Sequence, residues 1–157
     1  MKNDAAADAS DSPATDAVGS DAPDSAKPLG PPRLYVGSSD GKIRVFAFDD
    51  MSYALTLVDT TSAGGNPSFL AFTPDRKFLY AADEAMSRVA PFAIDAQTGK
   101  LAPLATVSSM GSGPAHVATD NAGTLVMVAN YGGGTIAIFP RPFGNETAGE
   151  ASVGSLD

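Results

Sequence analysis

The sequence of 157 residues has no cysteine and a single histidine, His116. Without cysteine it can form no disulfide, thiolate nucleophile or cysteine-based metal site. It also lacks any stretch near the roughly 20 apolar residues that a membrane-spanning helix needs. Polar residues rather than an apolar run follow Met1, so no signal peptide is evident. We therefore expect the chain in the cytoplasm as it stands, or in the periplasm or outside the cell if a signal sequence has been removed.

Basic residues are few as well. Ten Lys and Arg stand against 18 Asp and Glu, which gives a formal net charge of −8. The basic residues are scattered, and nucleic-acid binding requires them in clusters, so nucleic acid is excluded as a partner. Turn-forming residues are plentiful instead, with 16 Gly and 12 Pro. This composition is typical of an all-β chain with many turns.

The first segment, residues 1–33, differs in composition from the rest. It is rich in Ala, Asp, Ser and Pro, it has no aromatic residue, and Val18 and Leu29 are its only Val, Leu, Ile or Phe. Such a segment cannot offset the entropy of ordering by burying apolar surface, so we predict a disordered acidic tail. The alternative is a tether that holds a domain away from an envelope surface.

From residue 34 onward the sequence repeats with a period of about 45 to 47 residues. Three apolar segments align, each followed by a turn and a second apolar run, and the Gly64–Pro67 loop aligns with Gly111–Pro114. Short strands at this period predict β-propeller blades, which are four-stranded antiparallel meanders. The aligned segments are Leu34–Gly37, Leu79–Asp83 and Val126–Asn130.

The expected blades cover residues 34–62, 63–110 and 111–157. The first has strands at 34–37, 43–48 and 53–59, with a hairpin turn at Asp40-Gly41. The second has 68–72, 78–82, 88–94 and 101–107, and the third has 115–119, 125–130 and 135–139. Residues 143–157 show no convincing fourth strand. An open array leaves apolar faces uncovered, so we expect the isolated chain to be poorly stable or to associate. The alternative fold is a small β-sandwich.

His116 is the candidate catalytic residue. It lies two residues after Pro114, at the start of an expected innermost strand, where blade residues line the central channel of a propeller. A histidine there can act as a general acid or base near neutral pH. The equivalent residue one repeat earlier is Phe69, so the repeat itself does not require a histidine. The alternative is a structural histidine that hydrogen-bonds to the backbone.

Asn130 precedes a hairpin of three glycines, Gly132–Gly134. Glycine allows a tight connection, and asparagine can bridge loops through its amide. A plain turn is the alternative, and a phosphate-binding loop is disfavoured because a strand rather than a helix follows. The equivalent positions in the preceding repeat include Asp83, Glu84 and Arg88, which we interpret as solvated loop charges. The sequence shows no metal-binding pattern.

The residues around His116 and Asn130 resemble the lactonase family of seven-bladed β-propellers. This family includes bacterial 6-phosphogluconolactonase and fungal carboxymuconate-lactonising enzymes. The similarity covers roughly residues 34–145 and comprises a P-x-H motif, a D-x-x-G turn, a strand ending in A-N-Y, a glycine-rich turn and a strand ending in F-P. These motifs are at Pro114–His116, Asp120–Gly123, Ala129–Tyr131, Gly132–Gly134 and Phe139–Pro140.

The resemblance implies about two and a half of seven blades and a 6-phosphogluconolactonase-like hydrolysis of an anionic sugar-acid lactone. It implies that His116 is the catalytic acid or base, that Asn130 binds substrate or organises a loop, and that no cofactor or metal takes part. The Arg and Glu partners of the family come from later blades, so we expect this chain alone to be inactive. The alternatives are lactonisation, a non-catalytic β-propeller binding scaffold, and an extracytoplasmic surface-attached repeat protein. The sequence does not predict the oligomeric state.

Overall fold

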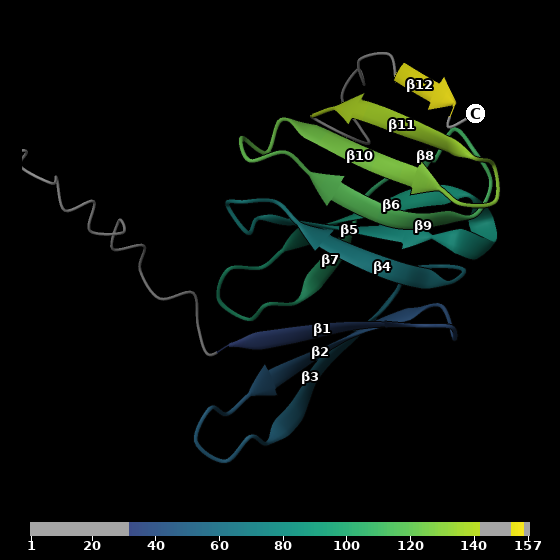
Figure 1. The fold of residues 1–157 in the computed structure, drawn as a ribbon. Helices are drawn as coiled ribbons and strands as arrows, with labels where there is room; N and C mark the ends of the chain where they lie inside the picture. The colour runs from purple at the N-terminus through teal and green to yellow at the C-terminus, as the bar shows by residue number, and fades with distance from the viewer. Residues whose placement is uncertain (1–31, 142–151, 156–157) are drawn as a thin grey trace, which may run out of the picture.

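The protein is built from antiparallel sheets that stack on one another (Figure 1). The computed structural model describes residues 32–141 and 152–155. In the first sheet, β1 (Arg33–Ser38), β2 (Lys42–Phe48) and β3 (Leu55–Ser62) follow one another in chain order. The predicted disordered tail, residues 1–33, lies outside the described residues except for its last two, and Arg33 is already the first residue of β1.

The second sheet contains β4 (Pro67–Phe72), β5 (Phe78–Asp83) and β6 (Arg88–Ile94). A short 3-10 turn, η1 (Glu84–Met86), joins β5 to β6. The sequence predicted a single fourth strand at 101–107, and this prediction is wrong. The structure has two shorter strands there, β7 (Leu101–Pro103) and β8 (Val107–Ser108), and both pair with β6. Pro91 in the middle of β6 accepts a hydrogen bond from Leu104 N but has no N–H to donate in return, and the pairing resumes at Val89–Val107.

The third sheet contains β9 (Pro114–Thr119), β10 (Leu125–Asn130), β11 (Thr135–Pro140) and β12 (Ser152–Ser155). The expectation that no fourth strand follows β11 is wrong, since β12 pairs with it in register from Thr135–Ser155 to Ile138–Ser152. Val153 is the single large apolar residue of β12, so the strand has no alternating pattern to reveal it. Backbone hydrogen bonds to β11 define it instead.

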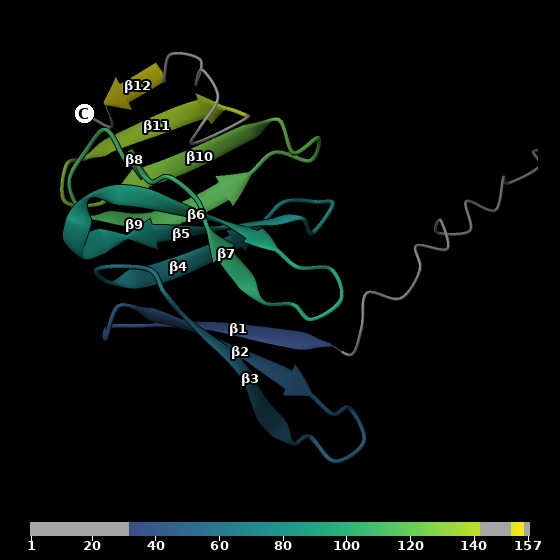
Figure 2. The same ribbon diagram turned by 180° about the vertical axis from the view of Figure 1, so that it is seen from behind.

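The second sheet lies between the first and the third (Figure 2). The core lies in two layers, one on each face of the second sheet. Alternate residues of β5 enter different layers: Leu79 and Ala81 face the first sheet, while Tyr80 and Ala82 face the third. This alternation follows from the two-residue period of a strand. A sheet that is buried on both faces between two similar sheets is the arrangement of neighbouring propeller blades, and this confirms the predicted all-β propeller architecture.

The first sheet also carries apolar residues on the face that points away from the second sheet. The register places Leu34 of β1, Phe46 of β2 and Leu57 of β3 next to one another. Leu57 remains 55% exposed and Leu34 43% exposed. Within the described part of the chain, β1 pairs with β2 alone, so its other edge is unpaired. An apolar face and a free edge are the features that a further blade would cover.

No helix in the described part of the chain is long and apolar enough to cross a membrane.

Candidate functional site

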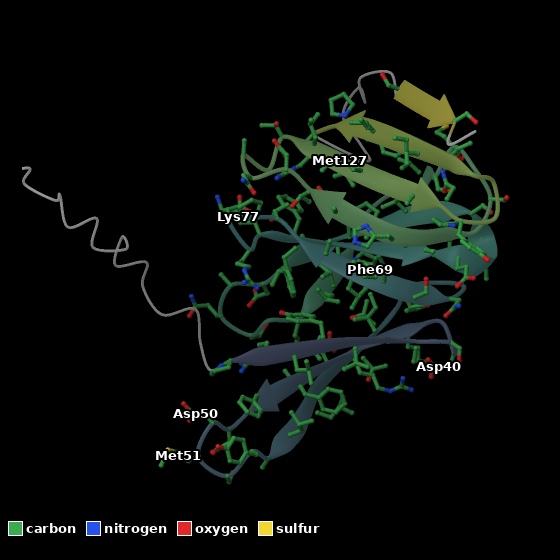
Figure 3. All side chains as sticks on the ribbon, in the orientation of Figure 1. Asp40, Asp50, Met51, Phe69, Lys77 and Met127 are labelled. Atoms are coloured by element: carbon green, nitrogen blue, oxygen red, sulfur yellow. The ribbon has the colours of Figure 1, made fainter. Side chains whose placement is uncertain are left out.

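His116 lies near the start of β9, and its side chain is exposed. Its imidazole packs against the ring of Phe69, with ring centroids 4.2 Å apart and planes inclined by 45°. Phe69 occupies the equivalent place on β4, and β4 and β9 are the edge strands of adjacent sheets that lie side by side (Figure 3). The rings of His116 and Phe69 therefore contact each other across the boundary between the second and third sheets, and we call them the ring pair.

A β-bulge exposes both of these rings. On β9, Pro114 pairs with Asn130 and His116 pairs with Ala129, so Ala115 between them has no partner on β10. On β4, the register likewise passes from Pro67–Asp83 to Phe69–Ala82. A bulge adds one residue to a strand and thereby redirects the side chains beside it. As a result Ala115 and His116, although consecutive, are both exposed.

Asn130 lies behind this strand start and is 1% exposed. Its Nδ2 donates hydrogen bonds to the backbone oxygen of Ser109 at 2.8 Å and to Oγ1 of Thr135 at 3.1 Å. Its Oδ1 is buried and accepts no hydrogen bond from the described residues. The glycine hairpin after Asn130 adds two backbone hydrogen bonds to the same connection, from Tyr131 N to Gly113 O and from Gly133 N to Ser112 O. The connection before His116, residues 109–113, is thus joined to the β10–β11 hairpin.

Asp83 plays the corresponding part in the second sheet. Its carboxylate accepts hydrogen bonds from the backbone N–H groups of Gly65 (3.1 Å) and Asn66 (2.8 Å), and from Nε of Arg88 at 2.8 Å. Asp83 is 0% exposed, so the interpretation of its charge as a solvated loop charge is wrong. The error arises because the loop that buries Asp83 is the connection between the first and second sheets, about 18 residues earlier in the chain, and the residues next to Asp83 do not reveal this contact.

A glycine in each connection makes room for these contacts. A Cβ atom on Gly64 would lie 1.8 Å from a terminal guanidinium nitrogen of Arg88. A Cβ atom on Gly111 would lie 2.5 Å from Nδ2 of Asn130 and 2.3 Å from Oγ1 of Thr135. Real atoms cannot approach this closely, so both connections require a residue without a side chain. This contact explains why the two glycine-rich loops align in the sequence.

The candidate site therefore has one titratable group, the imidazole of His116. No described side chain donates a hydrogen bond to it or forms an ion pair with it, and Phe69 is its ring contact. Asn130 is joined to the preceding connection rather than to the imidazole itself. Among the described residues, no group of three or more His, Asp or Glu could hold a metal ion. The arrangement offers an exposed acid–base group on an apolar wall.

Three aspartates with a lowered pKa lie in turns at the opposite end of the strands. The backbone N–H of Leu125 and the Thr124 hydroxyl and N–H lower the pKa of Asp120. In the same way, hydrogen bonds from Thr98 and Gln97 lower the pKa of Asp95. The hydroxyl of Thr73 is the main cause for Asp75. These carboxylates close hairpins and are structural groups.

Stacked antiparallel sheets of this kind, with three, five and four strands here, are the blades of a β-propeller. The family model "Lactonase, 7-bladed beta-propeller" matches residues 33–154, and the chain belongs to this family. The sequence is 30% identical over 115 residues to the 6-phosphogluconolactonase of Formosa agariphila, covering 68% of this chain and 33% of that protein. It is 32% identical over 106 residues to the 6-phosphogluconolactonase of Bacillus subtilis, covering 66% of this chain and 30% of that protein.

Solved structures agree with this assignment. A provisionally assigned 6-phosphogluconolactonase of Bacteroides fragilis superimposes with a TM-score of 0.66 and 28% identity, covering 78% of this chain and 35% of that one. The periplasmic gluconolactonase of Pseudomonas aeruginosa has a TM-score of 0.65 at 22% identity, covering 77% of this chain and 38% of that one, and so shows the shared fold. The chain spans about a third of the length of the curated relatives that it matches.

Proposed function

We propose that the protein is a lactonase that hydrolyses a sugar-acid lactone, with 6-phosphogluconolactone as the leading candidate substrate. The membership of the chain in the lactonase propeller family supports this proposal, as do its curated relatives named 6-phosphogluconolactonase. The observation that carries it is the position of His116. The only histidine of the chain is exposed on the edge strand of a blade, where the preceding blade has a phenylalanine.

In the proposed reaction His116 acts first as a general base and then as a general acid. The imidazole takes a proton from water while the water oxygen bonds to the lactone carbonyl carbon, which forms a tetrahedral oxyanion. The ring C–O bond then breaks, and the imidazolium returns the proton to the departing oxygen. The new carboxylic acid ionises and releases one proton to solution. Donors for the oxyanion and cations for the substrate anion are needed as well, and we expect them from parts of the propeller beyond these sheets.

We assign positioning roles to Phe69 and Asn130. Phe69 packs on the imidazole and restricts its rotation, which preserves the orientation needed for proton transfer. Asn130 joins the connection of residues 109–113 to the β10–β11 hairpin and thereby fixes the start of β9. In this role Asn130 organises the loop and does not itself contact the substrate.

The test is lactone hydrolysis by the protein as its gene encodes it, measured by proton release at constant pH above the spontaneous rate. Loss of a general acid–base group typically costs about 10²- to 10⁴-fold in rate, so we expect a fall in kcat of this size for His116→Ala. The control is Asn121→Ala, in an exposed turn at the opposite end of the same sheet. Both variants should keep the circular dichroism spectrum and the urea midpoint of the parent.

The outcomes separate the alternatives. Full turnover in His116→Ala would remove this residue from the mechanism while leaving the lactonase assignment standing. Absence of hydrolysis by the folded parent protein, across phosphorylated and neutral sugar lactones, would overturn the assignment and favour the non-catalytic binding scaffold.

A further inference from the structure

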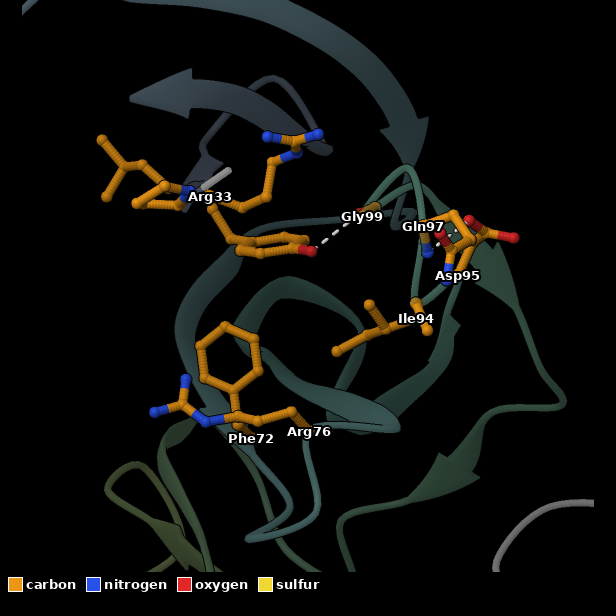
Figure 4. A pocket seen from close by; sticks show the side chains of 11 residues that line it. Arg33, Phe72, Arg76, Ile94, Asp95, Gln97 and Gly99 are labelled. Atoms are coloured by element: carbon orange, nitrogen blue, oxygen red, sulfur yellow. Dashed lines mark hydrogen bonds between the residues drawn. The ribbon is translucent and has the colours of Figure 1, made fainter. Parts of the chain in front are cut away.

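A cavity of about 490 Å³ lies between the first and second sheets, away from His116. It opens where β1 begins, beyond the end of β4 and beside the turn that follows β6 (Figure 4). Phe72, which lines it, is the last residue of β4, three residues after Phe69, and a strand advances about 3.3 Å per residue. The cavity is therefore separate from the ring pair of His116 and Phe69. Its volume is within the usual range for small-molecule sites.

The interior of the cavity is apolar, and its aromatic side chains are held in fixed positions. The rings of Tyr35 and Phe72 meet edge to face, with centroids 5.3 Å apart. The Tyr35 hydroxyl donates a hydrogen bond to the backbone oxygen of Gly99 at 2.7 Å, which fixes the ring across the two sheets. Ile94 adds aliphatic surface. The two rings contact each other, so together they form one aromatic side of the cavity, and this surface suits a flat apolar group.

Two arginines, Arg33 and Arg76, line this cavity from different elements (Figure 4). Arg33 belongs to β1, and its Nε donates to the backbone oxygen of Thr98 at 3.0 Å. Arg76 belongs to the turn after β4, and its guanidinium lies over the Phe72 ring, 4.9 Å from the centroid. Arg76 forms no ion pair with a described carboxylate.

The one carboxylate that lines the cavity, Asp95, is already engaged in its own turn. It accepts hydrogen bonds from the backbone N–H groups of Gln97 and Thr98 and from the Thr98 hydroxyl. The cavity therefore combines apolar walls with positively charged groups. The carboxylate of Asp95 is occupied by hydrogen bonds within its own turn. This charge distribution is complementary to an anion.

The backbone of Arg76 supplies an independent observation. Arg76 has a φ of 57°, in the left-handed region that favours glycine. The equivalent turn of the third sheet has Gly123 at this place, with a φ of 67°. The turn thus needs a left-handed residue in both repeats, and the second repeat uses an arginine at the expense of local strain. Strained backbone of this kind is concentrated at functional sites.

We propose that this cavity binds a small organic carboxylate with a flat aromatic or alicyclic body. The body lies against the joined surface of Tyr35, Phe72 and Ile94, and the carboxylate pairs with the guanidinium of Arg76. Arginine forms planar, two-pronged hydrogen bonds to carboxylates, and the Phe72 ring beneath Arg76 keeps the guanidinium plane in place. This site is independent of the lactonase proposal.

The experiment compares two probes of the same shape, 2-naphthoate and the uncharged 2-naphthamide, by titration calorimetry with the protein as its gene encodes it. We expect 2-naphthoate to bind with a Kd of roughly 0.1–1 mM and 2-naphthamide to bind about tenfold or more weakly. Equal affinity for the two probes, or no binding of 2-naphthoate at millimolar concentration, would overturn the proposal.

Arg76→Gly is the decisive variant, because glycine relieves the left-handed strain while it removes the guanidinium. We expect 2-naphthoate to bind roughly 10- to 100-fold more weakly, with a thermal midpoint equal to or above that of the parent. Lys77→Ala is the matched control, since it removes a neighbouring positive charge that does not line the cavity. It should change affinity by less than about twofold. Unchanged binding in Arg76→Gly, or an equal loss in Lys77→Ala, would refute the assignment.

Discussion

The Asp83–Arg88 ion pair supports the sharpest stability prediction. Asp83→Ala removes the acceptor of two backbone N–H groups, those of Gly65 and Asn66, and leaves Arg88 without its carboxylate. The connection between the first and second sheets would then have two partly buried donors without this partner. Because this connection joins two sheets, the loss of its hydrogen bonds should destabilise the interface between the sheets as well as the β5–β6 hairpin.

The expected cost can be estimated from the exposure of the two partners. Removing one member of a buried ion pair costs about 3–5 kcal/mol, chiefly because the other charge is left buried. The Asp83 side chain is 0% exposed, whereas that of Arg88 is 26% exposed and can gain some hydration. We therefore expect the lower end of this range, about 3 kcal/mol in the free energy of unfolding.

The third sheet offers a matched control for this prediction. It has Asn130 and Thr135 at the places of Asp83 and Arg88, and its neutral pair joins the equivalent connection. The double variant Asp83→Asn with Arg88→Thr should therefore recover more than half of the stability that Asp83→Ala loses. Urea unfolding followed by circular dichroism measures both. A loss below about 1 kcal/mol for Asp83→Ala, or a double variant no more stable than the single one, would refute the reasoning.

Two further predictions concern pH and the apolar face of the first sheet. Turn hydrogen bonds hold the folded-state pKa of Asp95 and Asp120 below 3.8, so their contribution to stability is present above that pH and is lost as pH falls through the lower folded values. The melting temperature should be flat above about pH 5 and decline below about pH 4; a melting temperature that stays level down to about pH 2 would contradict this. Leu57→Lys should cost about 1–3 kcal/mol in the full protein if another blade covers this face, and an effect within about 0.5 kcal/mol would show that the face is open to solvent.

The sequence predicted the strands best where the repeat could be compared with itself. Alignment of Leu79 with Val126 placed the second strand of two blades, and alignment of Phe69 with His116 identified two residues that pack against each other in the fold. These successes share a physical cause. Equivalent residues of a repeat have the same neighbours within the blade, so their alternation and turn chemistry carry most of the information.

The features that the sequence did not reveal depend on contacts between repeats. The burial of Asp83 requires the Gly64–Asn66 connection, which joins the first sheet to the second. The cavity beside Arg76 requires β1 and the turn after β6 to come together. The short β12 is defined by its pairing with β11 rather than by its own residues. None of these contacts leaves an alternating pattern of apolar residues in the sequence.

Within each repeat, the residues that support the backbone are separate from the exposed residue on the edge strand. Asp83 and Asn130 both join a connection to the hairpin behind it, although one uses an ion pair and the other an amide and a hydroxyl. Because this support is present in both blades, the residue on the exposed edge strand can change without loss of the backbone that presents it. Phe69 and His116 occupy the same bulged position, and only His116 can transfer a proton. A change of one side chain on a repeated backbone therefore suffices to place an acid–base group at the boundary between two blades.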